Sequence, residues 1–142
     1  MTDIGLTHVA LPIRDAERSI SFWSRYAGMQ VVHRRHGESE DREVVWLSDR
    51  TRPFVIVLIE ADEVDVVLAP IAHLGVGCPT REDVDRLAAL AGASGCLVRG
   101  PEDSGYPVGY WAFLRDPDGH ILELSHGQEV GLAVADPGQG ID

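Results

Sequence analysis

The order of the expected secondary-structure elements constrains the fold of this chain most strongly, because the same order occurs twice. Alternating apolar side chains predict strands, and apolar side chains three or four residues apart predict helices. The first series reads strand, helix and three strands, at residues 6–13, 14–28, 29–35, 42–49 and 54–60. The second series repeats it at residues 71–78, 80–92, 95–100, 109–116 and 120–126. A β-α-β-β-β order that occurs twice predicts an α+β protein of two similar modules.

Both expected helices have recognisable ends. Asp15 is placed as an N-cap and Gly28 as a stop for the first helix. Thr80 with Asp83 forms a capping box at the second helix, and Gly92 is its expected stop. The apolar stripes expected to face the core are Ala16, Ile20, Trp23 and Ala27 in the first helix, and Val84, Leu87 and Leu90 or Ala91 in the second.

The length of 142 residues suits a single domain with a substantial core. We expect module one at about residues 4–66, module two at about 70–126, and a loosely ordered tail at 127–142. No apolar run approaches the roughly 20 residues that span a bilayer, and no signal peptide is visible, so we expect a cytoplasmic protein without membrane partners. A net charge of −11 argues against a nucleic-acid partner. Cys78 and Cys96 lack the spacing of a zinc site and are expected in the core.

Two histidines and one glutamate occupy positions that invite a functional interpretation. His8 and His73 are each third in the first strand of a module, and both lie on the strand face with small residues. Glu123 lies within the last strand between two leucines, where a buried charge without a partner is costly. Two imidazoles and one carboxylate suit Zn, Ni, Mn, Fe or Co. Each residue alone is more often an ordinary polar side chain with satisfied hydrogen bonds, and their combination at matching positions leaves both interpretations open.

The stretch "DPDGHILELSHG" also contains two histidines that strand parity separates from Glu123. His120 and His126 lie on the face opposite Glu123, so we expect surface or strand-end roles for them rather than metal binding. The Asp-Pro-Asp-Gly sequence, residues 116–119, is typical of a turn, in which Pro and Gly set the backbone.

The chain resembles the vicinal oxygen chelate superfamily, the group of glyoxalases, bleomycin-resistance proteins and extradiol dioxygenases. The resemblance rests on "LTHVALPIRDAERSISFWSRYAGMQVV", "IAHLGVGCPTREDVDRL" and "GYWAFLRDPDGHILELSHG", and covers about residues 4 to 126. It implies two βαβββ modules that form a cupped mixed sheet, with a divalent metal held by His8, His73 and Glu123. It also implies a homodimer, in which the metal site is either intrachain or shared, and a metal that holds adjacent oxygens of a small-molecule substrate.

The resemblance leaves several branches open. Glyoxalase-like lyases or isomerases add a fourth ligand, for which Glu60 is the candidate, and acyl-CoA epimerases use a carboxylate base, a role that Glu60 also fits. Pro12 stands where glutathione-dependent glyoxalases carry arginine. Fosfomycin-modifying relatives use the same ligands, but no basic loop for a phosphonate is evident. We expect a metal-dependent glyoxalase-like enzyme.

Two rivals remain at this point. One is an Fe(II) extradiol dioxygenase, although Phe113 stands where such enzymes have a tyrosine and no acid–base histidine is evident between His36 and His73. The other is a metal-free drug-binding protein of the bleomycin-resistance type, for which Trp46 and Trp111 would line an aromatic groove.

Overall fold

The computed structural model describes residues 3–39 and 41–136, and the chain forms two compact units. Unit 1 comprises the chain up to Ile71 together with the short segment Asp116–His120. Unit 2 begins at Ala72, omits that segment and continues to the C-terminal part of the chain. The boundary falls at the start of predicted module two, but part of that module's sequence belongs to unit 1.

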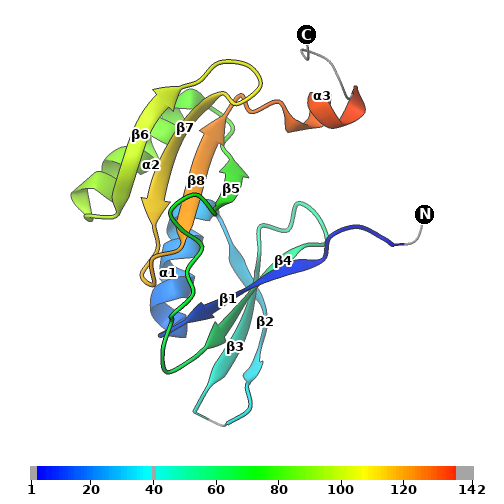
Figure 1. Cartoon of the computed structure of the whole chain (residues 1–142), viewed down its shortest axis with the longest axis vertical. Helices are drawn as coiled ribbons and strands as arrows, with labels where there is room; N and C mark the ends of the chain where they lie inside the picture. Colours follow the sequence, from blue (N-terminus) through cyan, green and yellow to red (C-terminus); the bar gives the residue numbers. More distant parts are fainter. Residues whose placement is uncertain (1–2, 40, 137–142) are drawn as a thin grey trace. The chain divides into compact units, whose positions relative to one another are not determined.

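Unit 1 is a four-stranded sheet with one helix, and its elements follow the predicted order (Figure 1). They are β1 (His8–Ile13), α1 (Ala16–Ala27), β2 (Gln30–His36), β3 (Glu43–Ser48) and β4 (Val55–Glu60). The strand order is β1-β4-β3-β2, in which β1 runs parallel to β4 and the other pairs are antiparallel. β1 is therefore an edge strand of this sheet, and the chain returns beside it only in β4, after α1, β2 and β3.

The two faces of the unit 1 sheet differ in burial and charge. The face covered by α1 is fully apolar at its centre, where Leu58, Val45 and Ile13 are completely buried. We call the opposite side the open face. Its cross-strand rows are His8–Val55, Ala10–Val57–Trp46–His33 and Pro12–Ile59–Val44–Arg35.

The ends of α1 are as predicted, whereas its buried face differs from the prediction. The Asp15 side chain accepts from Arg18 N, and Gly28 ends the helix with φ 64°. Ile20 and Ala27 are only half-buried, and the buried residues are Ala16, Ser19, Phe22, Trp23 and Tyr26. The buried face is rotated relative to the predicted stripe because Phe22 and Tyr26 also pack into the core. The prediction followed apolar residues at one spacing and omitted these two.

Unit 2 repeats the strand–helix–three-strand order in a second sheet. Its elements are β5 (Leu74–Gly77), α2 (Arg81–Ala93), β6 (Leu97–Asp103), β7 (Tyr110–Arg115) and β8 (Ile121–His126). The strand order is β5-β8-β7-β6, with β5 parallel to β8. Helix α2 covers one face, where Leu122, Leu124 and Leu114 are completely buried (Figure 1). The two βαβββ series confirm the predicted α+β class, although the hydrogen bonds form two four-stranded sheets.

Two local predictions in unit 2 need correction, and the structure selects between two residues that were predicted as alternatives. The capping box of Thr80 and Asp83 is present, but α2 continues through Gly92, and the backbone turns at Gly95 with φ 77°. Ala91 rather than Leu90 is buried. β5 begins one residue later than its histidine, so His73 precedes the strand. Glycine inside a helix is tolerated at a cost of about 1 kcal/mol, which is why Gly92 is a misleading stop signal.

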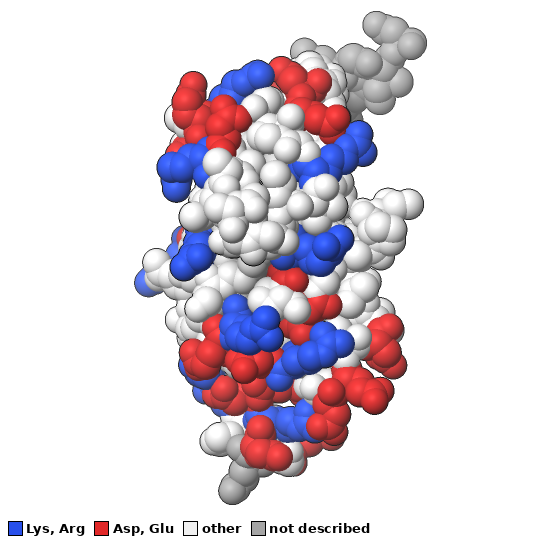
Figure 2. Space-filling view, turned by 90° about the vertical axis from the view of Figure 1, so that its left-hand side faces the viewer, with Lys and Arg blue, Asp and Glu red and all other residues white. Residues whose placement is uncertain are grey.

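A short helix, α3 (Val130–Ala135), lies where a loosely ordered tail was expected, and the rest of the predicted tail, residues 137–142, lies outside the described residues. Cys78 and Cys96 are both half-buried free thiols. Arginine side chains alternate with Asp and Glu on the face shown in Figure 2. Among the described residues, no helix has the length and apolarity needed to cross a membrane.

Two glycines in the β6–β7 connection provide a matched test of how closely this connection approaches the chain after β8. Both have positive φ, +72° at Gly105 and +85° at Gly109. A Cβ at Gly109 would lie 2.5 Å from His126 O and 2.7 Å from Gly127 C, whereas one at Gly105 would meet nothing within 4 Å. We expect Gly109→Ala to lower the free energy of unfolding by more than about 3 kcal/mol and Gly105→Ala by about 1–2 kcal/mol. Urea unfolding measures both, and equal losses would contradict the close approach.

Candidate functional site

The sheet of unit 2 brings two of the predicted ligands together on the face away from α2. Glu123 lies in the middle of β8, and its neighbours Leu122 and Leu124 point towards α2. His73 stands immediately before β5, the strand that pairs with β8. The nearest oxygen of Glu123, Oε2, lies 3.6 Å from His73 Nε2. The sequence prediction that Glu123 turns away from the two leucines is therefore matched by the strand register.

The distance between His73 Nε2 and Glu123 Oε2 distinguishes a direct hydrogen bond from the spacing of two ligands of one metal ion. A distance of 3.6 Å exceeds that of an ordinary N–H···O hydrogen bond. Two ligand atoms held about 2.1 Å from one metal ion, at an angle of about 110–120°, lie about 3.4–3.6 Å apart. The imidazole nitrogen and the carboxylate oxygen thus have the chemistry and the spacing of two ligands of one divalent ion.

The surroundings of Glu123 fit the same interpretation. Gly75 pairs with Glu123 across the parallel β5–β8 ladder, and a Cβ there would lie 3.2 Å from Oε2, so the absence of a side chain leaves space for the carboxylate. Phe113 pairs with Glu123 from the other side, and its ring lies 5.0 Å from the His73 ring. Glu123 is only 7% exposed. A carboxylate so buried requires a compensating positive charge or hydrogen bonds.

His8, the third predicted ligand, belongs to unit 1. It is exposed at the start of β1, on the open face of that sheet, and its Nδ1 lies 2.9 Å from Thr7 Oγ1. Within the described residues, no group of three or more His, Cys, Asp or Glu side chains is arranged to hold a metal. The part of His8 in a metal site therefore stays a prediction.

Glu60, predicted as a catalytic base or fourth ligand, has a different environment. It pairs with Ile13 and so lies on the α1 face of its sheet, the face opposite to His8. Its Oε2 accepts from Ala16 N at 2.9 Å, at the start of α1, and its Oε1 accepts from Glu43 N at 2.8 Å. The role predicted for Glu60 stays a prediction that this register does not favour. On the open face, the side that carries His8, the β4 residue beside Ala10 is Val57, whose apolar side chain is not a metal ligand.

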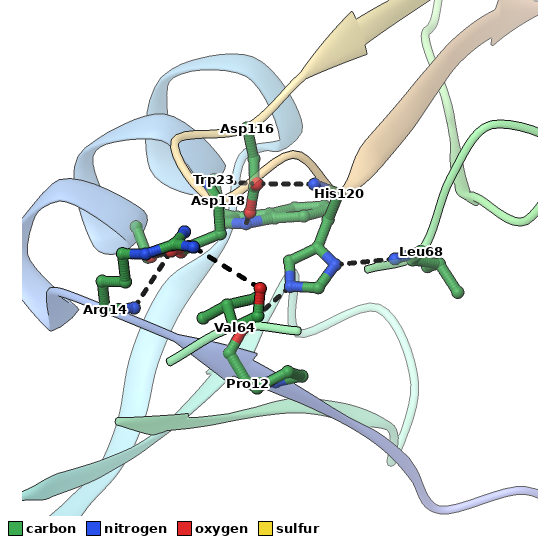
Figure 3. A network of polar contacts seen from close by, with 9 residues as sticks. Pro12, Arg14, Trp23, Val64, Leu68, Asp116, Asp118 and His120 are labelled. Carbon is green, nitrogen blue, oxygen red and sulfur yellow. Dashed lines mark hydrogen bonds and ion pairs between the residues drawn. The ribbon is translucent and has the colours of Figure 1, made fainter. Parts of the chain in front are cut away.

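A second polar cluster, which the sequence analysis missed, surrounds the segment Asp116–His120 in unit 1 (Figure 3). The segment forms the expected turn, with Gly119 at φ 100° and its N–H donating to Asp116 O. Asp116, Asp118 and His120 are all buried, with His120 completely inaccessible. The turn therefore does more than connect β7 to β8, because its three polar side chains are anchored in unit 1.

Two carboxylates hold the segment against β1 and α1. Trp23 Nε1 donates to Asp116 Oδ2 at 3.1 Å, and Oδ1 of the same carboxylate accepts from the backbone N–H groups of Asp118 and His120. Asp118 Oδ1 accepts from the backbone N and the guanidinium of Arg14, at 3.0 and 3.1 Å. Desolvation raises the pKa of Asp116 above its ordinary value, and the hydrogen bonds from the N–H groups oppose this effect.

His120 joins the segment to two other parts of unit 1. Leu68 N donates to Nδ1 at 2.9 Å, so Nδ1 is the unprotonated nitrogen, and Nε2–H donates to Pro12 O at 2.8 Å (Figure 3). The ring is thus a neutral imidazole with both nitrogens satisfied. The expectation of a surface or strand-end histidine was right about its position before β8 and wrong about exposure. His126 is half-buried, with Nδ1 3.1 Å from Cys78 O.

The signal that could have revealed this cluster is the density of polar residues beside strong turn residues. Two aspartates and a histidine within five residues are more than a turn requires. Their partners Trp23, Arg14 and Leu68 lie about 50 to 105 residues away in sequence. No local pattern pairs residues at such separations, so the signal would have indicated anchoring without identifying the anchor.

These observations define the class of protein. It has a two-module α+β fold, and an imidazole–carboxylate pair lies on one face of its second sheet. Residues 5–124 match the Glyoxalase/Bleomycin resistance protein/Dioxygenase superfamily, and the chain belongs to this superfamily. An uncharacterized protein of Pseudomonas aeruginosa is 38% identical over 129 residues, which cover 89% of this chain and 91% of that protein. A probable lactoylglutathione lyase of Vibrio parahaemolyticus is 27% identical over 144 residues, covering 94% and 99%.

Solved structures share the fold at lower identity. The trypanothione-dependent glyoxalase I of Leishmania major superposes with a TM-score of 0.70 and 21% identity, covering 97% of each chain. A Mn(II) complex of the fosfomycin resistance protein FosX from Listeria monocytogenes, in a mutant form, has a TM-score of 0.72 and 17% identity, covering 94% of this chain and 99% of that one. These likenesses establish the architecture.

Removal of the Trp23 indole N–H, which donates to Asp116, tests the anchoring of the segment Asp116–His120. We expect Trp23→Phe to lower the free energy of unfolding by about 2–4 kcal/mol, because the change leaves a buried carboxylate oxygen without its donor and reduces core volume. Trp46→Phe is the control, since Trp46 is 37% exposed, and should cost less than about 1 kcal/mol. Urea unfolding of both variants gives the comparison, and similar losses would show that the Trp23–Asp116 bond contributes little.

The raised pKa of Asp116 makes a prediction about acidification. An acid whose pKa is higher in the folded state binds its proton more tightly there. The wild type should therefore gain stability relative to Asp116→Asn as the pH falls through the folded pKa towards the unfolded value near 3.9. Urea unfolding of both proteins at about pH 7, 5 and 4 measures the difference. A difference that is constant, or that moves against the wild type on acidification, would refute the assignment.

Proposed function

We propose that this protein is a divalent-metal-dependent enzyme of the glyoxalase-like type, a lyase or isomerase that acts on a small molecule with vicinal oxygens. The observation that carries the proposal is the His73–Glu123 pair, with 3.6 Å between Nε2 and Oε2 on the α2-free face of the second sheet. Membership of the superfamily and the similarity to a probable lactoylglutathione lyase support the same reaction class.

Each residue of the pair has a defined task in this proposal. His73 and Glu123 are the ligands from this unit, and His8 is the third ligand, from this chain or from a second copy in a homodimer. The bound metal supplies Lewis-acid stabilisation of negative charge on adjacent substrate oxygens. Phe113 packs against the His73 ring and restricts its orientation, and Gly75 leaves the carboxylate room to reach the ion.

The metal could be Zn, Ni, Mn, Fe or Co, since imidazole and carboxylate ligands suit each of these ions. A dioxygenase ranks lower, because Phe113 offers no hydroxyl beside His73 and the Tyr110 hydroxyl donates to Asp85 instead. Glutathione as a co-substrate also ranks lower, because Pro12 replaces the expected arginine and Arg14 is bound to Asp118. A cytoplasmic location is part of the proposal.

Metal affinity is the most direct test. We expect the wild type, purified without chelator, to contain or take up about one divalent ion per chain, and Glu123→Gln or His73→Ala to weaken binding more than about 100-fold. Glu60→Gln is the matched control, because it removes a carboxylate that binds backbone N–H groups, and should leave metal affinity unchanged. Isothermal titration and elemental analysis provide the measurements.

The possible outcomes separate the parts of the proposal. A wild type that takes up no Zn, Ni, Mn, Fe or Co at micromolar concentration would overturn the metalloenzyme proposal as a whole. Unchanged affinity in His8→Ala would remove His8 from the ligand set and leave the His73–Glu123 pair. Consumption of the hemithioacetal of methylglyoxal and glutathione tests the glyoxalase reaction, and oxygen uptake with catechols and Fe(II) would favour the dioxygenase instead.

A further inference from the structure

The open face of the unit 1 sheet has an unusual charge pattern for this chain. The sequence contains 23 acidic and 12 basic residues, and every basic residue is arginine. The ten residues of the three open-face rows include no Asp or Glu, although they include Arg35, His33 and His8. In a protein with a net charge of −11, this face is a neutral to positive surface that attracts anions.

Trp46 provides a flat apolar surface at the centre of this face. It pairs with Val57 on one side and His33 on the other, and it is 37% exposed. The His33 ring lies 5.0 Å from the Trp46 ring, and the Arg35 guanidinium lies 5.9 Å from the same ring. An exposed tryptophan with a cation beside it can stack on a planar group while the cation binds an attached anion.

Arg35 is available to such an anion. No described carboxylate lies within ion-pair distance of its guanidinium, whereas the neighbouring Arg34 is paired with Glu17 and Glu43. Arg35, Val44 and Ile59 are among the residues that line a hollow of about 920 Å³ at the end of the sheet. A guanidinium without a carboxylate partner, beside open volume, retains its capacity for charge-assisted hydrogen bonds.

Three of the four described carboxylates around that hollow have ion-pair or hydrogen-bond partners. Glu43 is bound by Arg34, Asp62 by Arg42, and Glu60 by two backbone N–H groups. Glu38 is exposed to solvent. These contacts reduce the repulsion that the acidic residues would otherwise exert on an anion near Arg35.

We propose that the open face binds the planar, anionic end of the substrate, with Trp46 stacked on the planar group and Arg35 bound to a carboxylate. This proposal rests on the proposed function, because it assumes that the vicinal oxygens of the substrate bind at the end of the open face that carries His8. Neighbouring strands lie about 4.8 Å apart, so Trp46 is about 10 Å across the sheet from β1, and Arg35 is one strand farther. The substrate class is therefore an aromatic or conjugated carboxylate with its vicinal oxygens at the opposite end.

Binding of a simple planar anion to the metal-free protein tests this proposal. The probe is 2-naphthoate, followed through the indole N–H signals of ¹⁵N-labelled protein, with the Trp46 signal assigned from Trp46→Phe. We expect the Trp46 signal to shift, and Arg35→Gln to weaken binding about 10-fold. Arg18→Gln, which removes an exposed arginine from α1, should leave the affinity within about twofold. The neutral 2-naphthamide and the non-planar cyclohexanecarboxylate should each bind about 10-fold more weakly than 2-naphthoate.

Several results would overturn the proposal. These are equal binding of 2-naphthoate and 2-naphthamide, a shift confined to Trp111, or equal losses in Arg35→Gln and Arg18→Gln. A Trp46 signal that changes on dilution of the free protein would show that a second copy covers the face. The titration is repeated with Glu123→Gln, for which we expect unchanged binding. Failure of the metal site therefore leaves this result intact, and failure of naphthoate binding leaves the metal test intact.

Discussion

The burial of polar groups in the segment Asp116–His120 is the interaction on which the arrangement of unit 1 depends. Trp23 is a completely buried aromatic side chain in that unit, and its indole N–H finds its acceptor in Asp116. β1 is an edge strand, and the carbonyl of Pro12 is bound by His120 rather than left unpaired. The connector after β4 has no regular structure, and contacts from Arg14 to Val64 O and from Leu68 N to His120 hold it. One five-residue turn thereby satisfies groups from a helix, an edge strand and a loop.

The same turn leads directly into the strand that carries Glu123. The backbone passes between the units at Ile71–Ala72, Arg115–Asp116 and His120–Ile121, so the candidate ligand lies three residues beyond a buried imidazole of the other unit. The two polar clusters therefore have separate tasks. The three polar side chains of the Asp116–His120 cluster all have hydrogen-bond partners within unit 1. The facing atoms of His73 and Glu123 have the spacing of two metal ligands rather than that of a good hydrogen bond.

Much of the fold was predictable because side-chain alternation reports strand faces directly. It placed Glu123 away from Leu122 and Leu124, and it separated His120 from Glu123. Errors arose where glycine is tolerated inside a helix as well as at its end, and where the apolar side chains of a helix were counted at one spacing. Gly92 reads as a helix stop, yet the chain turns at Gly95, and the α1 stripe missed Phe22 and Tyr26. The anchoring of His120 was beyond prediction, since Leu68 and Pro12 are brought to it only by tertiary structure. Of the candidate site, the His73–Glu123 pair could be anticipated from strand alternation together with the family resemblance, although the register partner of Glu123 in β5 is Gly75 and His73 precedes that strand.

Residues 116–120 belong to unit 1 although they follow most of unit 2 in sequence, and this order affects how the chain folds during synthesis. The N-terminal part of a nascent protein ordinarily folds before the remainder emerges from the ribosome. Here the first 71 residues lack the acceptor for Trp23, the partner of the Arg14 backbone N–H and the donor for Pro12 O until residue 120 has been made. The first unit must therefore wait, incompletely closed, for most of the second to be translated. Folding of the two halves is coupled in time by the order in which the ribosome delivers them.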